Sequence, residues 1–257
     1  MSQRTTYPPG VPCWVDNLVP DPARSMSFYG ELFGWEFDGP GPGEYFEARL
    51  RGGGVAGLGA QPPGAAAGWN TYVSVTSAQD TARAAARAGG RVVIEPFDAL
   101  PAGRVAVIAD PSGAQIGLWQ PAERSGAELV NEPGAWAMSL LSTRTPDMAS
   151  AFYRDVFEWE AESFAPGISL FRLEGYVGGE PAQPVPRDVV AAMAQGDGPE
   201  GWGVDFWVSD ADAIASKAPA LGGAVIAPPF TDPGGMRHAV LADPDGAAFT
   251  VTAAPGH

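Results

Sequence analysis

At 257 residues and 45% hydrophobic content, the chain is long enough for two globular domains, and its 34 glycines and 26 prolines predict many turns. The formal net charge of −15 argues against nucleic acid or an anionic membrane as partner, because phosphate binding relies on clustered Lys and Arg, and Lys217 is the only lysine. Cys13 is the only cysteine, which excludes an intrachain disulfide and a Cys-based zinc site, and no apolar leader or spanning segment is visible, so we expect a cytoplasmic protein.

The sequence contains an internal repeat. Residues 28–35 (FYGELFGW) return as 152–159 (FYRDVFEW), 124 positions later, and residues 103–114 return as 236–247, 133 positions later. A repeat of this length predicts two domains built alike, each with its own core. We place the domains at residues 8–121 and 134–254, joined by a polar linker at 122–133.

The first half begins with a strand and a helix. Residues 11–18 are short and apolar, which predicts a strand. Asp21 can cap the next helix, with Pro22 at its first position, and Phe28 begins an apolar face with helical spacing that ends at Gly34. Short extended runs then predict three strands, at residues 35–37, 45–50 and 55–58.

The same order of elements follows a loop rich in proline and glycine. Ser77 can cap a second helix, which ends at Gly89. A strand at residues 70–75 precedes this helix, and strands at 91–94, 104–108 and 115–119 follow it. Each half is therefore predicted to hold two βαβββ modules, which makes the chain an α+β protein.

The second half repeats this order with a longer loop. Its predicted elements are a strand at 135–141, a helix at 145–156, a strand at 204–208 and a helix at 210–221. Nine extra residues enter between Trp159 and Trp202, and we assign them to a loop at residues 178–201. Within it, residues 187–194 can form two helical turns. The loop is either a lid over a site or a surface excursion.

These features together resemble the vicinal oxygen chelate superfamily, which includes glyoxalase I, bleomycin-resistance proteins and extradiol dioxygenases. The resemblance rests on the βαβββ order, the helix from Asp21 to Tyr29, the Gly-Gly pair after the second helix, and the turn Asp110-Pro111-Ser112-Gly113. It covers both halves. It implies that the eight strands of each domain curl into a half-open cup, and tandem members often carry a hydroxylase label.

The resemblance also implies where a metal would be bound, through His or Glu side chains of the first, middle and last strands of each cup. Residues with poor metal affinity occupy these positions, and the sequence has only two histidines, His238 and His257. We therefore predict no metal and no cofactor. The positions are Trp14, Asn70 and Gly117 in the first half, and Met138, Gly203 and Thr250 in the second.

Residues two places away from these positions should also face the cups, because side chains alternate along a strand. Many are aromatic, which suits a flat, partly polar aromatic ligand. Alternatively, they fill cups that have closed. The candidate substrate-binding residues are Trp14, Asn70, Gln115, Trp119, Trp136, Met138 and Trp207.

Four residues are candidates for acid/base catalysis. Asp16 and Asp205 would have a raised pKa in apolar surroundings, and each could act as a general acid or base. Tyr72 could donate a hydrogen bond to an oxyanion or enolate. His238 is the only internal histidine. The alternative for each is a structural role, as a capped carboxylate, a core tyrosine or a packed histidine.

Two functional hypotheses follow. The first is a metal-independent enzyme of specialised metabolism, such as antibiotic biosynthesis, acting on an aromatic, polyketide-like molecule by acid/base chemistry (dehydration or cyclisation) or by cofactor-free oxygenation. The second is a non-catalytic protein that sequesters a toxic aromatic compound. A structural protein with both cups filled is a third possibility. We expect a monomer or homodimer in which the repeated Phe28-Tyr29 stretch anchors each first helix against its sheet.

Overall fold

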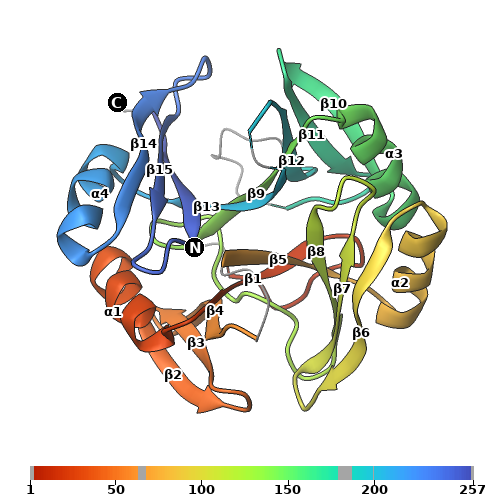
Figure 1. Ribbon diagram of the computed structural model, residues 1–257, viewed down its shortest axis with the longest axis horizontal. Coiled ribbons are helices and arrows are strands. Elements are labelled where there is room, and N and C mark those ends of the chain that lie inside the picture. The colour runs from red at the N-terminus through yellow and green to blue at the C-terminus, as the bar shows by residue number, and fades with distance from the viewer. Residues whose placement is uncertain (1–2, 63–67, 179–186, 199, 256–257) are drawn as a thin grey trace.

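A computed structural model describes residues 3–62, 68–178, 187–198 and 200–255. In these ranges the chain forms sixteen strands, four α-helices and one short 3₁₀-helix. None of the helices in this part of the chain is long and apolar enough to cross a membrane. The elements alternate as the repeat predicts (Figure 1).

The first half carries two βαβββ modules. Its elements are β1 (Pro12–Val19), α1 (Pro22–Phe33), β2 (Glu36–Gly41), β3 (Tyr45–Leu50), β4 (Gly53–Ala60), β5 (Gly68–Ser74), α2 (Ala78–Arg87), β6 (Arg91–Ala99), β7 (Gly103–Ala109) and β8 (Gln115–Pro121).

The second half carries two more modules, with the second helix continued by a 3₁₀ turn. Its elements are β9 (Trp136–Thr143), α3 (Pro146–Phe157), β10 (Trp159–Ala165), β11 (Ile168–Leu173), β12 (Val189–Gln195), β13 (Gly201–Trp207), α4 (Ala211–Lys217), η1 (Ala218–Leu221), β14 (Ala224–Thr231), β15 (Arg237–Ala242) and β16 (Ala248–Ala253).

Each half folds into one eight-stranded sheet of mixed strand direction. The strand order is β2-β3-β4-β1-β5-β8-β7-β6 in the first sheet and β10-β11-β12-β9-β13-β16-β15-β14 in the second. Strand for strand the two orders are the same, which confirms the predicted α+β fold of two tandem domains. We call the concave faces of the two sheets the first cup and the second cup.

The predicted helix boundaries of α1 are confirmed by its capping interactions. The Asp21 side chain accepts a hydrogen bond from the Arg24 backbone N–H (3.3 Å), and Pro22 occupies the first helical position. Gly34 ends the helix in the left-handed conformation, at φ 76°. Local sequence therefore fixes where the chain leaves the helix and enters β2.

The two helical turns predicted at residues 187–194 are wrong, because this segment contains β12. The strand pairs in parallel with β9, where Ala192 lies opposite Leu140, and antiparallel with β11. Its Ala191 and Met193 side chains are buried, and so are the neighbouring Val190 and Ala192. A strand buried on both faces has no alternating pattern, so its sequence resembles a buried helix. The remaining extra residues lie between β11 and β12, and residues 179–186 of the predicted loop are outside the described ranges.

The repeated tyrosines connect the two halves. Tyr29 on α1 donates to Asp243 Oδ2 of the second half (3.3 Å), and Tyr153 on α3 donates to Asp110 Oδ2 of the first half (3.2 Å). An indole also donates to each tyrosine oxygen, from Trp69 (3.0 Å) and from Trp202 (2.8 Å). The prediction that the Phe-Tyr stretch anchors each first helix against its sheet is therefore incomplete, because this stretch also joins the two halves.

The Gly-Gly pairs after the second helices leave room for the partner half. A Cβ atom on Gly223 would lie 2.7 Å from the Phe28 ring, and one on Gly90 would lie 2.6 Å from the Phe152 ring. Figure 1 shows α1 beside α4 and α2 beside α3, and contacts join α1 with η1 and α2 with α3. The first helix of each half therefore packs beside the second helix of the other half.

The buried side chains form two clusters, each of which combines residues of both halves. One cluster includes Phe28 and Tyr29 of the first half together with Phe206 and Phe249 of the second. The other cluster joins Ile108 and its neighbours to the second half's Phe152 and Trp159. The expectation of a separate core in each domain is wrong, because each helical face is completed by the other half.

Replacing either tyrosine by phenylalanine should destabilise the whole protein. Tyr29→Phe leaves Asp243 and the Trp69 indole with one hydrogen bond fewer in a buried place, and Tyr153→Phe does the same to Asp110 and Trp202. We expect each change to lower the free energy of unfolding by about 1–3 kcal/mol in denaturant titrations.

The control is Phe164→Leu at an exposed aromatic residue of β10, which should change stability by less than about 0.5 kcal/mol. A Tyr29→Phe protein as stable as the control would show that the cross-domain hydrogen bonds contribute nothing.

Candidate active site

The strand register sets which side chains lie level with one another in each cup. In the first cup Trp14, Tyr72 and Gly117 are direct neighbours on β1, β5 and β8. In the second cup Met138, Asp205 and Thr250 are direct neighbours on β9, β13 and β16. On the middle strand, Tyr72 completes the row in the first cup and Asp205 completes it in the second. Each lies two residues after the position expected from the sequence, which was Asn70 in the first cup and Gly203 in the second.

The first cup is organised around Asp16, which accepts three hydrogen bonds. Its Oδ2 atom accepts from the hydroxyls of Tyr72 (2.9 Å) and Tyr45 (3.2 Å), and its Oδ1 atom accepts from Asn70 Nδ2 (3.0 Å). The indole of Trp14 donates in turn to the Tyr45 hydroxyl (2.8 Å). The structure thus brings together four of the predicted residues and adds Tyr45.

Aromatic rings fill the first cup by lying over glycines. A Cβ atom on Gly57 would collide with the Tyr45 hydroxyl, and one on Gly117 would collide with the Tyr72 ring. Glycine at these places lets each ring approach the backbone. Gly57 and Gly59 lie on the same face of β4, and both are next to the Tyr45 side chain. Two glycines at this spacing in the sequence could have indicated that a large ring packs against this face.

The linker closes the first cup further. The Arg124 guanidinium lies 5.5 Å from the Trp14 ring centre and pairs with Glu47, and the Arg124 carbonyl accepts from the Trp119 indole (2.9 Å). Asp16 is only 4% exposed and Trp119 only 9%. A molecule could therefore reach Asp16 only by displacing several packed side chains.

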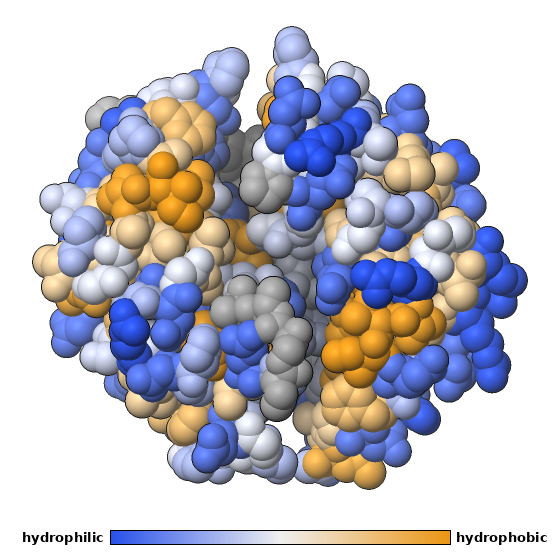
Figure 2. All heavy atoms as spheres, viewed as in Figure 1, coloured by the Kyte–Doolittle hydropathy of each residue, from blue (hydrophilic) through white to orange (hydrophobic). Residues whose placement is uncertain are grey.

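The second cup has lost these rings. Met138 replaces Trp14 of the first cup, Asp205 replaces Tyr72, and Thr252 replaces Trp119. Met138 and Asp205 are partly exposed, in contrast to their buried counterparts. Figure 2 shows a notch at the top of the view between the arm with β14 and β15 and the arm with β10 and β11. Judged by the exposure of these side chains, the second cup is less completely filled than the first.

Only one of the two carboxylate oxygens of Asp205 has a hydrogen-bond partner among the described residues. Its Oδ2 atom is hydrogen-bonded to the Thr252 hydroxyl (2.6 Å), whereas Oδ1 is buried and contacts no donor among the described residues. Burial raises the pKa of Asp205 from 3.8 to about 7, and the Thr252 hydrogen bond opposes this shift. Such a carboxyl exchanges its proton near neutral pH.

His238 is joined to Asp205 through Thr252. Its Nδ1 atom lies 2.8 Å from Thr252 Oγ1, and its Nε2 atom lies 3.2 Å from Asp232 Oδ2. The Phe230 ring stacks on the imidazole, with the ring centres 5.3 Å apart. Strand pairing also places Trp207 opposite Thr252, so aromatic side chains stand at both ends of this row.

The remaining predicted residues lie away from the two carboxylates. Gln115 is exposed at the start of β8. Trp136 is buried at the start of β9, and its indole Nε1 has no hydrogen-bond partner within the described ranges. The alternation of side chains places Thr252 on the inner face of β16 together with Thr250. Its hydrogen bond to Asp205 and the contact of Asp232 with His238 were missed by sequence reasoning, because threonine hydroxyls and turn aspartates carry no distinctive spacing.

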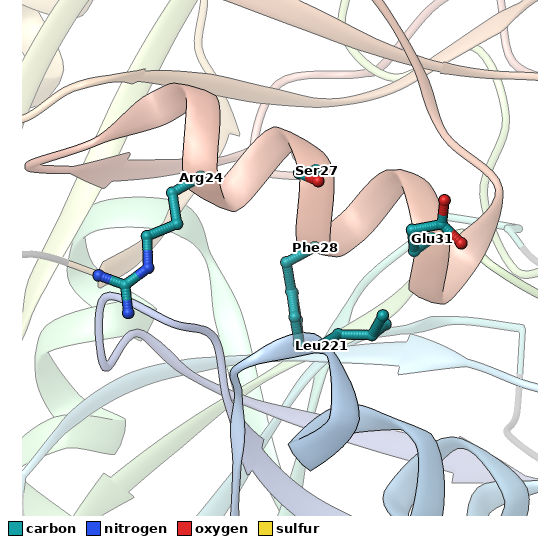
Figure 3. A pocket seen from close by; sticks show the side chains of 5 residues that line it. All are labelled: Arg24, Ser27, Phe28, Glu31 and Leu221. Carbon is teal, nitrogen blue, oxygen red and sulfur yellow. The ribbon is translucent and has the colours of Figure 1, made fainter.

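A separate hollow lies between α1 and η1, lined by Arg24, Ser27, Phe28, Glu31 and Leu221. Figure 3 shows Phe28 pointing toward Leu221, while Arg24 and Glu31 point away from each other. The Arg24 guanidinium is held by the Pro244 carbonyl (2.6 Å) of the other half. This hollow belongs to the interface between the halves and brings no acid and base together.

Comparison with known proteins gives the same fold for both halves. Residues 14–118 match the "Glyoxalase/Bleomycin resistance protein/Dioxygenase superfamily", and residues 138–252 match the "Glyoxalase-like domain" family. The protein named "Putative glyoxylase CFP32" from Mycobacterium tuberculosis (strain CDC 1551 / Oshkosh) is 40% identical over 98% of this chain and 97% of its own length. The chain belongs to the glyoxalase/bleomycin resistance/dioxygenase superfamily.

Two other proteins are similar along nearly the whole chain. "Anthracycline biosynthesis protein DnrV" from Streptomyces peucetius is 34% identical, and "Anthracycline biosynthesis protein DauV" from Streptomyces sp. (strain C5) is 33% identical. In both cases the match covers 96% of this chain and 94% of the relative.

Two solved structures share the fold. The Mn(II)-bound glyoxalase from Novosphingobium aromaticivorans matches with a TM-score of 0.66 at 18% identity, over 95% of this chain and 82% of its own. The 2,3-dioxygenase LapB from Pseudomonas sp. KL28 matches with a TM-score of 0.65 at 12% identity, over 96% and 93%.

The metal-binding positions of the superfamily do not fit a metal in this chain. The first row offers an indole, a phenol and a glycine, and the second offers a thioether, one carboxylate and a hydroxyl. Divalent metals require several nitrogen, oxygen or sulfur donors that converge. Across the described residues, no three His, Cys, Asp or Glu side chains are grouped so that they could hold an ion.

The raised pKa of Asp205 gives a pH-dependent stability. Because the folded-state pKa of about 7 exceeds the ordinary 3.8, the carboxyl contributes stability below about pH 4 that is lost as the pH rises through 7. Asp205→Asn, which cannot ionise, should match the wild type near pH 4 and exceed its free energy of unfolding by roughly 1–3 kcal/mol at pH 8.

Asp16→Asn is the matched comparison. Burial also raises the pKa of Asp16, to about 6, but three donors face this carboxylate, so the amide should destabilise the protein at both pH values. A difference between Asp205→Asn and the wild type that stays constant from pH 4 to 8 would contradict a raised pKa at Asp205.

Proposed function

We propose that the protein is an enzyme of specialised metabolism that binds an aromatic, polyketide-like molecule in the second cup and moves a proton through Asp205. The observation that carries this proposal is the buried, unpartnered Oδ1 atom on a carboxyl that titrates near neutrality. A general base needs both properties, a free lone pair and a pKa close to the working pH.

The aromatic side chains of the second cup support a flat ligand. Trp207, His238 and Phe230 lie in one row that crosses β13, β16, β15 and β14. Neighbouring strands are about 4.8 Å apart, so the row extends over roughly 14 Å. A fused-ring molecule placed along it would contact rings at both ends, and at the β13 end it would present an oxygen to Asp205, which lies two residues before Trp207 on that strand.

The relatives support the same class of substrate. DauV and DnrV are named for anthracycline biosynthesis, and anthracyclines contain fused aromatic rings with phenol and ketone oxygens. Removal of a proton from such a phenol or from the adjacent ring carbon begins a dehydration or a cyclisation. The same step also prepares an electron-rich ring for cofactor-free reaction with oxygen.

The alternative function is a binding protein that sequesters an aromatic compound. It requires the same row of aromatic side chains, but it does not require a proton on Asp205. The two functions therefore differ in what happens after binding, and one probe can separate them.

The probe is 1,8-dihydroxyanthrone, an aromatic polyketide-like phenol with exchangeable hydrogens at C10. Under anaerobic conditions in D₂O at pH 7, the wild type should bind it with quenching of tryptophan fluorescence and accelerate the exchange of hydrogen for deuterium at C10, measured by NMR. Asp205→Asn should retain binding and lose about 10²–10⁴-fold of the acceleration.

Two equivalent exposed phenylalanines show which cup is used. Phe230→Ala in the second cup should weaken binding at least about 10-fold, whereas Phe97→Ala at the same place of the first sheet should not, although both residues are similarly exposed, at 46% and 48%. Binding without accelerated exchange would favour sequestration. Equal effects of the two phenylalanine changes would overturn the assignment to the second cup.

A further inference from the structure

Four polar side chains of the second cup form one continuous hydrogen-bonded chain. It runs from Asp205 Oδ2 to Thr252 Oγ1 (2.6 Å), from there to His238 Nδ1 (2.8 Å), and from His238 Nε2 to Asp232 Oδ2 (3.2 Å). The chain crosses three adjacent strands and ends in the turn between β14 and β15.

The far end of the chain is held in place by the backbone. Asp232 Oδ1 accepts from the Met236 N–H (2.8 Å), and the Asp232 N–H donates to the Met236 carbonyl (2.9 Å). The turn thus presents Oδ2 to His238. Arg237, the sequence neighbour of His238, pairs with Asp212 instead and leaves the Asp232 carboxylate to the imidazole.

The single proton of the Thr252 hydroxyl limits how the chain can be protonated. In one arrangement the Asp205 carboxylic acid donates to Thr252, Thr252 donates to Nδ1 of a neutral His238, and its Nε2–H donates to Asp232. In the other, an imidazolium His238 donates from Nδ1 to Thr252 and from Nε2 to Asp232, and Thr252 donates to an ionised Asp205. In both arrangements each of the three hydrogen bonds of the chain has one donor and one acceptor, and Asp205 Oδ1 is left without a partner among the described residues.

The two arrangements differ only in where two protons lie. One proton passes from Asp205 Oδ2 to Thr252 Oγ1 while the hydroxyl proton passes from Oγ1 to His238 Nδ1. The total charge of Asp205, His238 and Asp232 is −1 before and after. In the second arrangement the charged carboxylate therefore has an imidazolium close by, which offsets the cost of ionising the acid.

We propose that Thr252 and His238 form a proton relay that ionises Asp205 while its Oδ1 atom stays free for the substrate. A substrate proton then bonds to Oδ1, its electron pair remains on the substrate, and the imidazolium balances the new negative charge. Thr252, His238 and Asp232 are positioning residues in this account, and Asp205 is the catalytic residue. The relay rests on the proposed function for its purpose, but the hydrogen-bonded chain exists without a ligand.

The first cup provides an internal comparison. Its equivalents of Asp205, Thr252, His238 and Asp232 are Tyr72, Trp119, Val105 and Ala99, so the repeat carries no such chain in the first half. The two sheets have the same strand order, but only the second contains this chain. The fold therefore does not require it.

The relay can be tested by NMR on the ligand-free protein. With His257→Gln, ¹⁵N-histidine labelling reports His238 alone, and its two ring nitrogens distinguish the neutral Nδ1–H, neutral Nε2–H and imidazolium forms. When the imidazole is neutral, the relay predicts the Nε2–H tautomer, with Nδ1 accepting from Thr252 and Nε2–H donating to Asp232. Asp205 is followed through ¹³C-labelled aspartate carboxyl signals, assigned by their loss in Asp205→Asn.

The decisive measurement is a double-mutant cycle. His238→Gln should move the titration midpoint of Asp205 by at least about one pH unit in the wild type, but by less than about 0.3 in a Thr252→Val background, which keeps the shape and removes the hydroxyl. Thr250→Val, the control at a neighbouring threonine on β16, should leave the coupling intact.

A neutral Nδ1–H form of His238, or a coupling that survives Thr252→Val, would overturn the relay. These outcomes are independent of the anthrone probe. If the coupling is present but hydrogen exchange at C10 is not accelerated, the relay is supported and the proposed reaction is overturned. If accelerated exchange depends on Asp205 but not on Thr252, the proposed reaction is supported and the relay is overturned.

Discussion

The hydrogen bond from a tyrosine of one half to a turn aspartate of the other is the interaction on which the rest of the structure depends. Asp243 uses Oδ1 to accept the N–H groups of its own turn, from Asp245 and Ala247, and Oδ2 to accept from Tyr29. Burial and the nearby Asp243 charge raise the pKa of Tyr29 well above its usual range, so the phenol keeps its proton and stays a donor.

Because the same link occurs twice, it fixes both sheets without using either cup. The Tyr153 hydroxyl meets Asp110 in the way that Tyr29 meets Asp243, and Thr71 and Ser139 hydroxyls lie 2.6 Å apart between the two sheets. The helices, the turns and the sheet centres carry the interface. The concave faces are consequently free to differ. Aromatic rings fill the first cup around the buried Asp16, whereas Asp205 of the second cup is partly exposed.

The sequence predicted what depends on short-range rules. Helix caps and the alternation of side chains along each strand follow from neighbours within one element. That Asp16, Asn70 and Tyr72 share one cup was expected from the family resemblance, because β1 and β5 belong to different modules. The sequence could not predict contacts that depend on pairing over long distances. Tyr45 enters the first cup from β3, Thr252 joins Asp205 from a strand 47 residues away, and Tyr29 reaches the other half. β12 was missed because burial on both faces erases its period.

The aspartates of the two cups, Asp16 and Asp205, show why a raised pKa does not by itself identify a catalytic acid. Burial raises the pKa of both, to about 6 for Asp16 and about 7 for Asp205. Three donors occupy both oxygens of Asp16, so a substrate proton could bind there only after a hydrogen bond is broken, at a cost of about 1–3 kcal/mol. Asp205 has one donor and a free Oδ1. The number of donors, more than the degree of burial, decides which carboxyl can do chemistry.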